Sequence, residues 1–249
     1  MKILLLLAIT LVFSCKSVDE GSYLDVVGGI ATEDFPGIMG MKIYDPQSSY
    51  DEVCTVTLVE DKIFLTAAHC LVKTPQFKFE IFTGTDIFSR SKKGKMLEIE
   101  EYLIHPQFSL NNFQAGFDFA LVKVTQSVGV PPIAFSTGKN RSFSELELVG
   151  FGFEGPYDRE LSGIKRKVLL PVKRFDASHV VAGRYMKTSC KGDSGGPALI
   201  YKNGQALVVG VVSYGDCFRD SHINLLDSDQ GFIVKGIQQL VQSSPRDPK

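Results

Sequence analysis

Three short segments of the chain contain side chains that could act together on a carbonyl substrate. Ser194 lies among glycines in Gly192–Pro197, where glycine permits a sharp turn and lets backbone N–H groups converge on one point. His69 follows the apolar run Ile63–Leu65, and Asp118 stands between two phenylalanines. A serine hydroxyl becomes nucleophilic when a neighbouring base takes its proton, and a carboxylate among apolar residues needs a partner for its charge. These residue types predict nucleophilic catalysis.

The composition indicates what kind of protein carries these residues. The chain has 249 residues, of which 44 % are hydrophobic, and its 27 basic and 28 acidic residues give a net charge of -1. Such values are ordinary for a globular protein and exclude low-complexity disorder. Neither half carries a notable basic excess, so we expect no nucleic-acid partner. The length fits one domain of a little over 200 residues, or two small ones.

The first segment is interpreted as a targeting signal. Lys2 precedes an apolar run over Ile3–Phe13, which is too short to cross a bilayer core of about 30 Å but suits a secretory signal peptide. Ser14 and Cys15 end the run, as in the lipobox of bacterial lipoproteins, where the cysteine is lipidated. We therefore assign residues 1–15 to a signal peptide of an exported, bacterial-type protein. Two outcomes stay open: lipidation at Cys15, which would attach the protein to a membrane, and ordinary signal cleavage nearby.

The cysteine count also favours export. If Cys15 is removed or lipidated, an even four remain, which are Cys54, Cys70, Cys190 and Cys217. Four cysteines allow three pairings, and an oxidising compartment would favour two disulfides. No CxxC or Cys/His spacing indicates zinc, and we expect neither a metal nor a cofactor.

Beyond the signal the pattern is mostly that of strands. Short runs rich in alternating apolar residues are separated by Gly, Asn, Pro and Asp, which predicts a barrel or sandwich instead of βαβ units. The predicted strands cover 53–58, 77–81, 119–124, 145–149, 167–172 and 206–213. Near the end, apolar residues at i, i+4, i+7 and i+8 predict one face of a short helix, formed by Ile233, Ile237, Leu240 and Val241. Residues 244–249 show no periodicity and are expected to form a loose tail.

The motifs occur in an order that resembles the trypsin/chymotrypsin family of serine proteases. His69, Asp118 and Ser194 follow one another as in that family, and Val26–Gly29 matches the mature amino terminus of its members. Smaller matches are Gly150–Gly152 and Ser213–Gly215, and the resemblance covers about 216 of the 249 residues. It implies an all-β fold of two six-stranded antiparallel β-barrels packed together, with a short C-terminal helix, over residues 26–243. Residues 16–25 would then be a pro-segment.

The resemblance also implies a role for each residue of the site. Ser194 would attack a peptide carbonyl, His69 would take its proton, and Asp118 would orient the imidazole and stabilise its charged form. The N–H groups of Gly192 and Ser194 would bind the oxyanion. The family's disulfides correspond to Cys54–Cys70 and Cys190–Cys217. The expected function is therefore an exported serine endopeptidase that acts on proteins or peptides through an acyl-enzyme.

In this family, activation depends on a cut before the residue that matches Val26. The new α-amino group would pair with Asp193 and reorganise the loop so that the oxyanion donors converge. Asp25, instead of Arg or Lys, precedes the cut, so activation by a trypsin-like enzyme is not indicated.

The substrate pocket is the part of the site on which the sequence leaves alternatives. Thr188 occupies the family's pocket base, Ser189 follows it, and Ser213, Tyr214 and Gly215 would form a wall. These residues predict a neutral, partly polar pocket. Asp220 could instead reach the pocket from the opposite side, and an acidic pocket would then accept Lys or Arg.

A second class of function is a protease-fold binding or adhesion protein that has lost activity. Such proteins usually lack a catalytic residue, and His69, Asp118 and Ser194 are all present here. An esterase could use the same three residues, but esterases usually have a different fold and order of residues. We expect a monomer in either case.

Overall fold

The computed structural model describes residues 25–49, 51–88, 93–139, 141–155 and 163–243. The predicted signal peptide with Cys15, nearly all of the predicted pro-segment, and the tail 244–249 lie outside the described residues. Among the described residues, no helix combines the length and hydropathy needed to span a bilayer.

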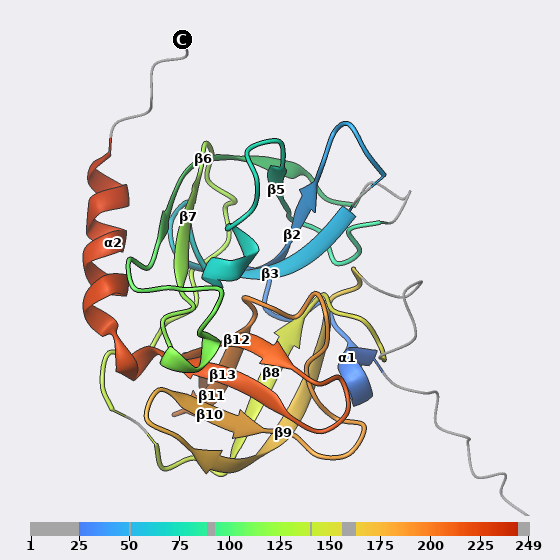
Figure 1. Ribbon diagram of the computed structural model, residues 1–249, viewed down its shortest axis with the longest axis vertical. Helices are drawn as coiled ribbons and strands as arrows, with labels where there is room; N and C mark the ends of the chain where they lie inside the picture. The colour runs from blue at the N-terminus through green and yellow to red at the C-terminus, as the bar shows by residue number, and fades with distance from the viewer. Residues whose placement is uncertain (1–24, 50, 89–92, 140, 156–162, 244–249) are drawn as a thin grey trace, which may run out of the picture.

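Six antiparallel strands close the first barrel, which is the upper one in Figure 1. Their order around the barrel is β2-β3-β4-β7-β6-β5. The strands are β2 (Ile38–Tyr44), β3 (Asp51–Glu60), β4 (Ile63–Thr66), β5 (Lys78–Phe82), β6 (Met96–Ile104) and β7 (Ala120–Val124).

The second barrel lies below the first and is also closed by six antiparallel strands. Its strands pair in the order β9-β10-β13-β12-β11-β8, and β8 pairs back onto β9. They are β8 (Glu145–Gly150), β9 (Arg166–Phe175), β10 (His179–Ala182), β11 (Pro197–Lys202), β12 (Gln205–Gly215) and β13 (Ser221–Leu225). The two-residue strand β1 (Ile30–Ala31) adds to the outside of β9. The predicted two-barrel fold is confirmed.

One hydrophobic core joins the two barrels. The buried side chains of the first barrel are continuous with Val149, Leu199 and Val208 of the second, while a separate cluster fills the interior of the second barrel. Phe64 and Phe119 are among the largest fully buried side chains in the described residues. Burial of an aromatic or aliphatic side chain stabilises the fold by about 2 kcal/mol, so this shared core fixes the barrels relative to each other.

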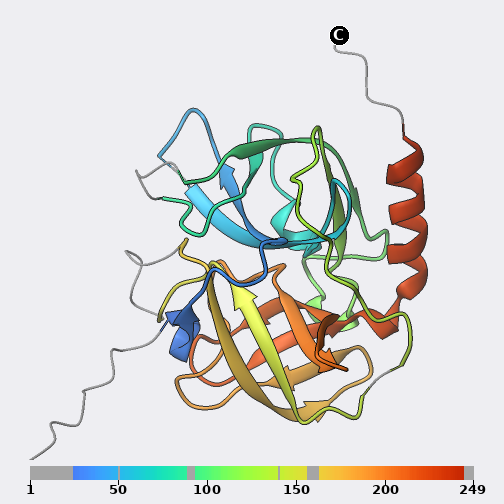
Figure 2. The same cartoon turned by 180° about the vertical axis from the view of Figure 1, so that it is seen from behind.

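The C-terminal helix α2 (Gln230–Gln242) begins at the second barrel and runs along the first, as Figure 2 shows from behind. Gly236 lets it approach β7 closely, because a Cβ there would lie 2.6 Å from Cδ1 of Leu121. Ile233 and Leu240 are buried as predicted, but Val241 is 60 % exposed and is not part of the packed face. The remaining short helices are α1 (Asp25–Gly28), η1 (Ala68–Cys70), η2 (Phe113–Ala115) and η3 (Leu226–Ser228).

Candidate active site

The two barrels each contribute to one site. His69 lies in the 3-10 turn η1 that follows β4, and Asp118 lies two residues before the neighbouring strand β7, so both come from the first barrel. Ser194 lies in the loop before β11 of the second barrel. Thr55 of β3 links the two parts, since its N–H donates to the Ser194 carbonyl at 2.8 Å.

Asp118 is completely buried and accepts three hydrogen bonds. Its Oδ2 lies 2.7 Å from Nδ1 of His69 and 2.5 Å from the Ser213 hydroxyl, and its Oδ1 accepts from the His69 backbone N–H at 2.9 Å. A carboxylate can only accept, so the proton of a neutral imidazole stands on Nδ1. The Nε2 atom of His69 is then left with a lone pair that can accept a proton.

Ser194 and His69 both approach the first disulfide. The Cys70 sulfur, bonded to Cys54, lies 3.8 Å from Nε2 of His69 and 3.7 Å from the Ser194 carbonyl oxygen. Ser194 is partly exposed, whereas Asp193 and Gly195 beside it are buried. The turn therefore presents the serine at the surface, with its carbonyl near the same sulfur as the imidazole.

The backbone around Ser194 has the shape that an anion site requires. Gly192 has a φ of +100°, and a Cβ there would lie 2.8 Å from Cα of Gly152, so a side chain would be both strained and obstructed. Its carbonyl accepts from the Thr55 hydroxyl at 2.9 Å, which fixes the orientation of the peptide. Within the described part of the chain, no acceptor occupies the N–H of Gly192 or of Ser194.

Asp193 is 2 % exposed and faces away from the surface. Its carboxylate accepts the N–H groups of Gly152 at 2.8 Å and Cys190 at 2.9 Å. Burial raises the pKa of Asp193 to about 7, although the two N–H groups and the Arg166 guanidinium oppose the rise. The N–H groups and Arg166 therefore do not fully offset the cost of burying the Asp193 charge.

The chain around the predicted activation point forms the helical turn α1, which includes Val26. Val27 is buried, and its carbonyl accepts from the Thr188 N–H at 3.1 Å. This contact places the segment directly beside the residues of the predicted pocket.

The residues at the base of the pocket are fully buried and uncharged. The Thr188 hydroxyl lies 2.9 Å from that of Ser221, which also accepts from the Ser189 N–H at 2.7 Å. In the described residues the Ser189 hydroxyl has no partner, and a Cβ on Gly215 would lie 2.4 Å from it. The base thus offers hydroxyl groups beside a glycine wall.

Sequence reasoning missed Ser221. Its position follows from the ladder between β12 and β13, where it pairs with Gly215, and the sequence carries no local signal of that pairing. Asp220, which the sequence left as an alternative pocket acid, instead directs its carboxylate to the Nζ of Lys173 on β9. The second disulfide, Cys190–Cys217, joins the Ser194 loop to the segment that carries Asp220.

Tyr214 belongs to a series of ring contacts that reaches the imidazole of His69. Its ring stacks on His222 with centroids 4.2 Å apart, and its other contacts include the Phe113 ring at 6.1 Å. Phe113 in turn meets the His69 ring edge-on at 5.6 Å. These rings provide an apolar surface next to the candidate base.

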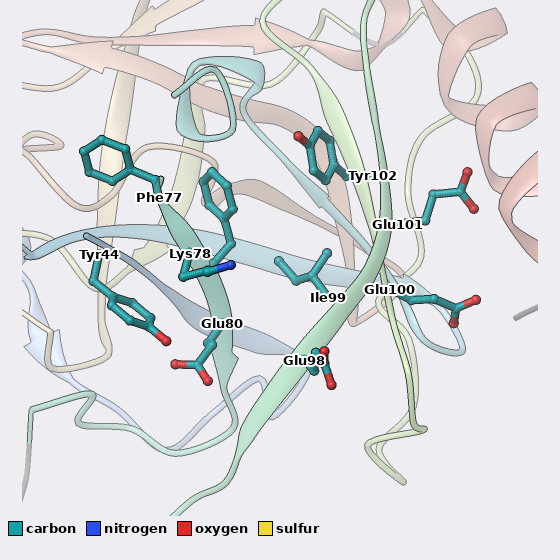
Figure 3. Close-up of a pocket in the computed structure, with 10 residues that line it drawn as sticks. Tyr44, Phe77, Lys78, Glu80, Glu98, Ile99, Glu100, Glu101 and Tyr102 are labelled. Atoms are coloured by element: carbon teal, nitrogen blue, oxygen red, sulfur yellow. The ribbon is translucent and has the colours of Figure 1, made fainter. Parts of the chain in front are cut away.

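Two other places bring together side chains that could bind a ligand. In the described residues, the one cluster of metal-binding side chain types is Cys54, His69 and Cys70, and its cysteines form a disulfide that leaves no thiolate for a metal. A groove on the first barrel, shown in Figure 3, is lined by aromatic and acidic side chains that include Tyr44, Glu98 and Tyr102. It contains none of the candidate catalytic residues.

Comparisons with known proteins agree with the geometry. The model of the trypsin family matches residues 30–226. Chymotrypsin-like elastase family member 1 of Bos taurus is 28 % identical over 214 residues, which cover 76 % of this chain and 78 % of the relative. Serine protease 28 of Mus musculus is 26 % identical and covers 94 % and 99 %, and trypsin of Phaedon cochleariae is 26 % identical and covers 85 % and 86 %. This chain belongs to the trypsin family of serine proteases.

Proposed function

We propose that the protein is a serine endopeptidase that hydrolyses peptide bonds through Ser194, His69 and Asp118. The observation that carries the proposal is the bond between Nδ1 of His69 and the buried Asp118, made where Ser194 approaches the same disulfide. The imidazole that Asp118 holds and the backbone of Ser194 therefore lie near the same sulfur, although they come from opposite barrels.

In the first step, the Ser194 Oγ bonds to the peptide carbonyl carbon while its proton passes to Nε2 of His69. The carbonyl oxygen becomes an oxyanion beside the N–H groups of Gly192 and Ser194. The C–N bond then breaks, and His69 gives its proton to the leaving amine. Water attacks the resulting acyl-enzyme, loses a proton to His69 and releases the acid with regeneration of the serine.

The proposed substrates carry a neutral residue at P1, the position before the cut bond. Thr188 and Ser221 bring two hydroxyl groups to the predicted pocket base without a charge, and Ser189 adds a hydroxyl that has no partner among the described residues. A Lys or Arg side chain placed there would lose water without gaining a carboxylate partner. Asp220 already contacts Lys173, which favours the neutral alternative.

The proposed activation is a cut between Asp25 and Val26, which frees an α-amino group that can pair with Asp193. Among the described residues, no cation forms an ion pair with the buried Asp193, which supports this pairing. We further propose that the signal peptide 1–15 directs export. A lipid at Cys15 is one route by which the precursor could attach to a membrane. The cut before Val26 would then release a soluble protease. The relatives described above are animal proteins, so a bacterial-type export route rests on the lipobox-like residues alone.

A fluorophosphonate probe tests the proposal, because it reacts with a serine that is activated by a neighbouring base. The chain beginning at Val26 should be labelled, Ser194→Ala should not, and Ser109→Ala, which changes an exposed serine, should be labelled like the wild type. A correctly processed, disulfide-bonded chain that the probe does not label would overturn the proposal and favour an inactive binding protein.

A further inference from the structure

Asp193, which precedes Ser194, lies near two other buried charged side chains. Arg166 at the start of β9 is 2 % exposed, and its guanidinium contacts the carboxylate of Glu154, which is also largely buried. Asp193 is the third charged residue in this region; the Arg166 charge acts to lower its pKa, although no ion pair joins the two side chains in the described residues. Arg166 therefore lies within electrostatic range of a second buried carboxylate.

The strand register explains why Arg166 and Asp193 face the same compartment. Arg166 pairs with Gly150 across β8 and β9. The Asp193 carboxylate lies against that part of β8, since a Cβ on Gly150 would stand 2.2 Å from its Oδ1. The N–H of Gly152, two residues further along, donates to the same oxygen. Asp193 thus turns toward the ladder position that carries Arg166.

The neighbouring cations on β9 and before it face elsewhere. Lys165 is buried, but its Nζ donates to the Phe35 carbonyl. Lys167 points outward and contacts Asp34. Of these three successive basic residues, only Arg166 acts on Asp193.

The arrangement of the loop does not need the cut. The peptide between Asp25 and Val26 is intact, and yet Asp193 already accepts two N–H groups, and the N–H groups of Gly192 and Ser194 have no acceptor within the described residues. The desolvation of a buried carboxylate is offset by N–H donors, by nearby positive charge or by uptake of a proton, and a nearby cation favours the ionised form.

We propose that Arg166 is a positioning residue that holds Asp193 inward in the uncut chain and thereby gives the precursor measurable activity. Glu154 limits this activity because it competes for the same guanidinium. The inference rests on the proposed function, and it assigns the uncut form a partly assembled oxyanion site. The α-amino group of Val26 then acts as a second cation and completes the charge balance.

The test compares the rate of fluorophosphonate labelling in uncut and cut chains, with the amino terminus verified by mass spectrometry. In the uncut chain, Arg166→Met should slow labelling by about tenfold or more, since it removes the cation that orders the oxyanion donors. Arg166→Lys should retain most of the rate. Glu154→Gln should increase the rate several-fold, because the Glu154 charge no longer competes with Asp193 for Arg166. Lys167→Met is the matched control on the outer face of β9 and should change nothing.

In the chain cut before Val26, the Arg166 and Glu154 variants should alter labelling much less, because the α-amino group supplies the charge. Equal slowing of both forms by Arg166→Met, or slower labelling of uncut Glu154→Gln, would overturn the inference and indicate a merely structural ion pair. If the cut wild type is not labelled at all, the proposed function fails. The inference is then decided by ¹³C NMR titration of Asp193 in the uncut chain, whose pKa should rise in Arg166→Met and fall in Glu154→Gln; no change in either variant would overturn it.

Discussion

The Ser213 hydroxyl donates to Oδ2 of Asp118, the same oxygen that accepts from Nδ1 of His69, at a distance of 2.5 Å. The donor and the carboxylate are both buried. A carboxylate without solvent depends on such donors to remain ionised, so Ser213 helps Asp118 to hold the imidazole in place.

Ser213→Ala should lower kcat/KM by about 10-fold to 100-fold, because a hydrogen bond to a charged group contributes about 1.5–3 kcal/mol. The loss should appear mainly in kcat, since Ser213 acts through Asp118. Ser213→Thr, which keeps the hydroxyl, is the matched variant and should recover part of the rate. Steady-state kinetics on one peptide substrate measures both, and an unchanged kcat in Ser213→Ala would show that the bond does not affect the base.

The pocket yields a prediction about substrate preference. Thr188→Asp places a carboxylate beside the Ser221 hydroxyl and should raise kcat/KM for Arg relative to neutral P1 residues by about tenfold or more. Asp220→Ala should leave that ratio nearly constant, because its carboxylate contacts Lys173 instead. A peptide library with varied P1 measures the ratio. A wild type that prefers Arg or Lys by about 100-fold, with the preference lost in Asp220→Ala, would contradict the neutral pocket.

Part of the architecture could be predicted because the signal was local. Apolar and polar residue types alternate in β3, and each of the six predicted strands is present, although β3 and β12 are buried through most of their length. The strands β2, β4, β6, β10, β11 and β13 were not predicted. All four residues of β4 and of β10 are buried, and a short strand that is buried throughout has no alternation.

The positions of the candidate catalytic residues were anticipated from motifs, but their surroundings were not. Ser221 meets Ser189 from 32 positions away, and Lys173 meets Asp220 from 47. Both contacts depend on which residues face each other across β9, β10, β12 and β13, and a shift of one residue would turn each side chain to the other face. The sequence contains no local sign of that register.

We expect the bond between His105 and Asp229, which lies outside the active site, to stabilise the protein. His105 is buried, its ring stacks on Phe117 at 4.8 Å, and its Nε2 bonds to Oδ2 of Asp229 at 2.7 Å. Oδ1 of Asp229 accepts from the Phe232 N–H and so caps α2. Asp229→Ala should destabilise the protein by about 2 kcal/mol, the sum of a lost cap and a lost bond to a buried ring. Asp229→Asn keeps the cap and should cost less.

Asp229 also predicts how the stability of the protein depends on pH. Burial acts to raise the pKa of Asp229, but the His105 and Phe232 bonds outweigh it and lower the pKa below its ordinary 3.8. A carboxyl with a lower pKa in the folded state stabilises the fold above its unfolded pKa, and this contribution is lost as pH falls through the folded value. Urea unfolding of Asp229→Asn and wild type should therefore converge below about pH 4. A difference that persists there would mean that the carboxylate charge contributes nothing.

In the uncut chain, the contribution of Asp193 to stability should depend on pH in the opposite direction to that of Asp229. Burial raises its pKa from 3.8 to about 7, so the folded chain binds this proton more tightly than the unfolded chain does. Its contribution to stability is therefore greatest below about pH 4 and declines as the pH rises toward 7. In the uncut chain, Asp193→Asn should become more stable relative to wild type over that range, as measured by urea unfolding in a Ser194→Ala background that prevents self-digestion.

Cleavage before Val26 should reverse this slope. The freed α-amino group, which has an ordinary pKa near 8, brings a cation to Asp193 and lowers the pKa of its carboxyl. The ionised pair then stabilises the cut chain at neutral pH, so Asp193→Asn should be the less stable variant there. Above about pH 8, loss of the ammonium proton should weaken the pair and reduce activity, with an apparent pKa raised by the carboxylate. The same pH dependence of stability in cut and uncut chains would show that the new amino terminus does not reach Asp193.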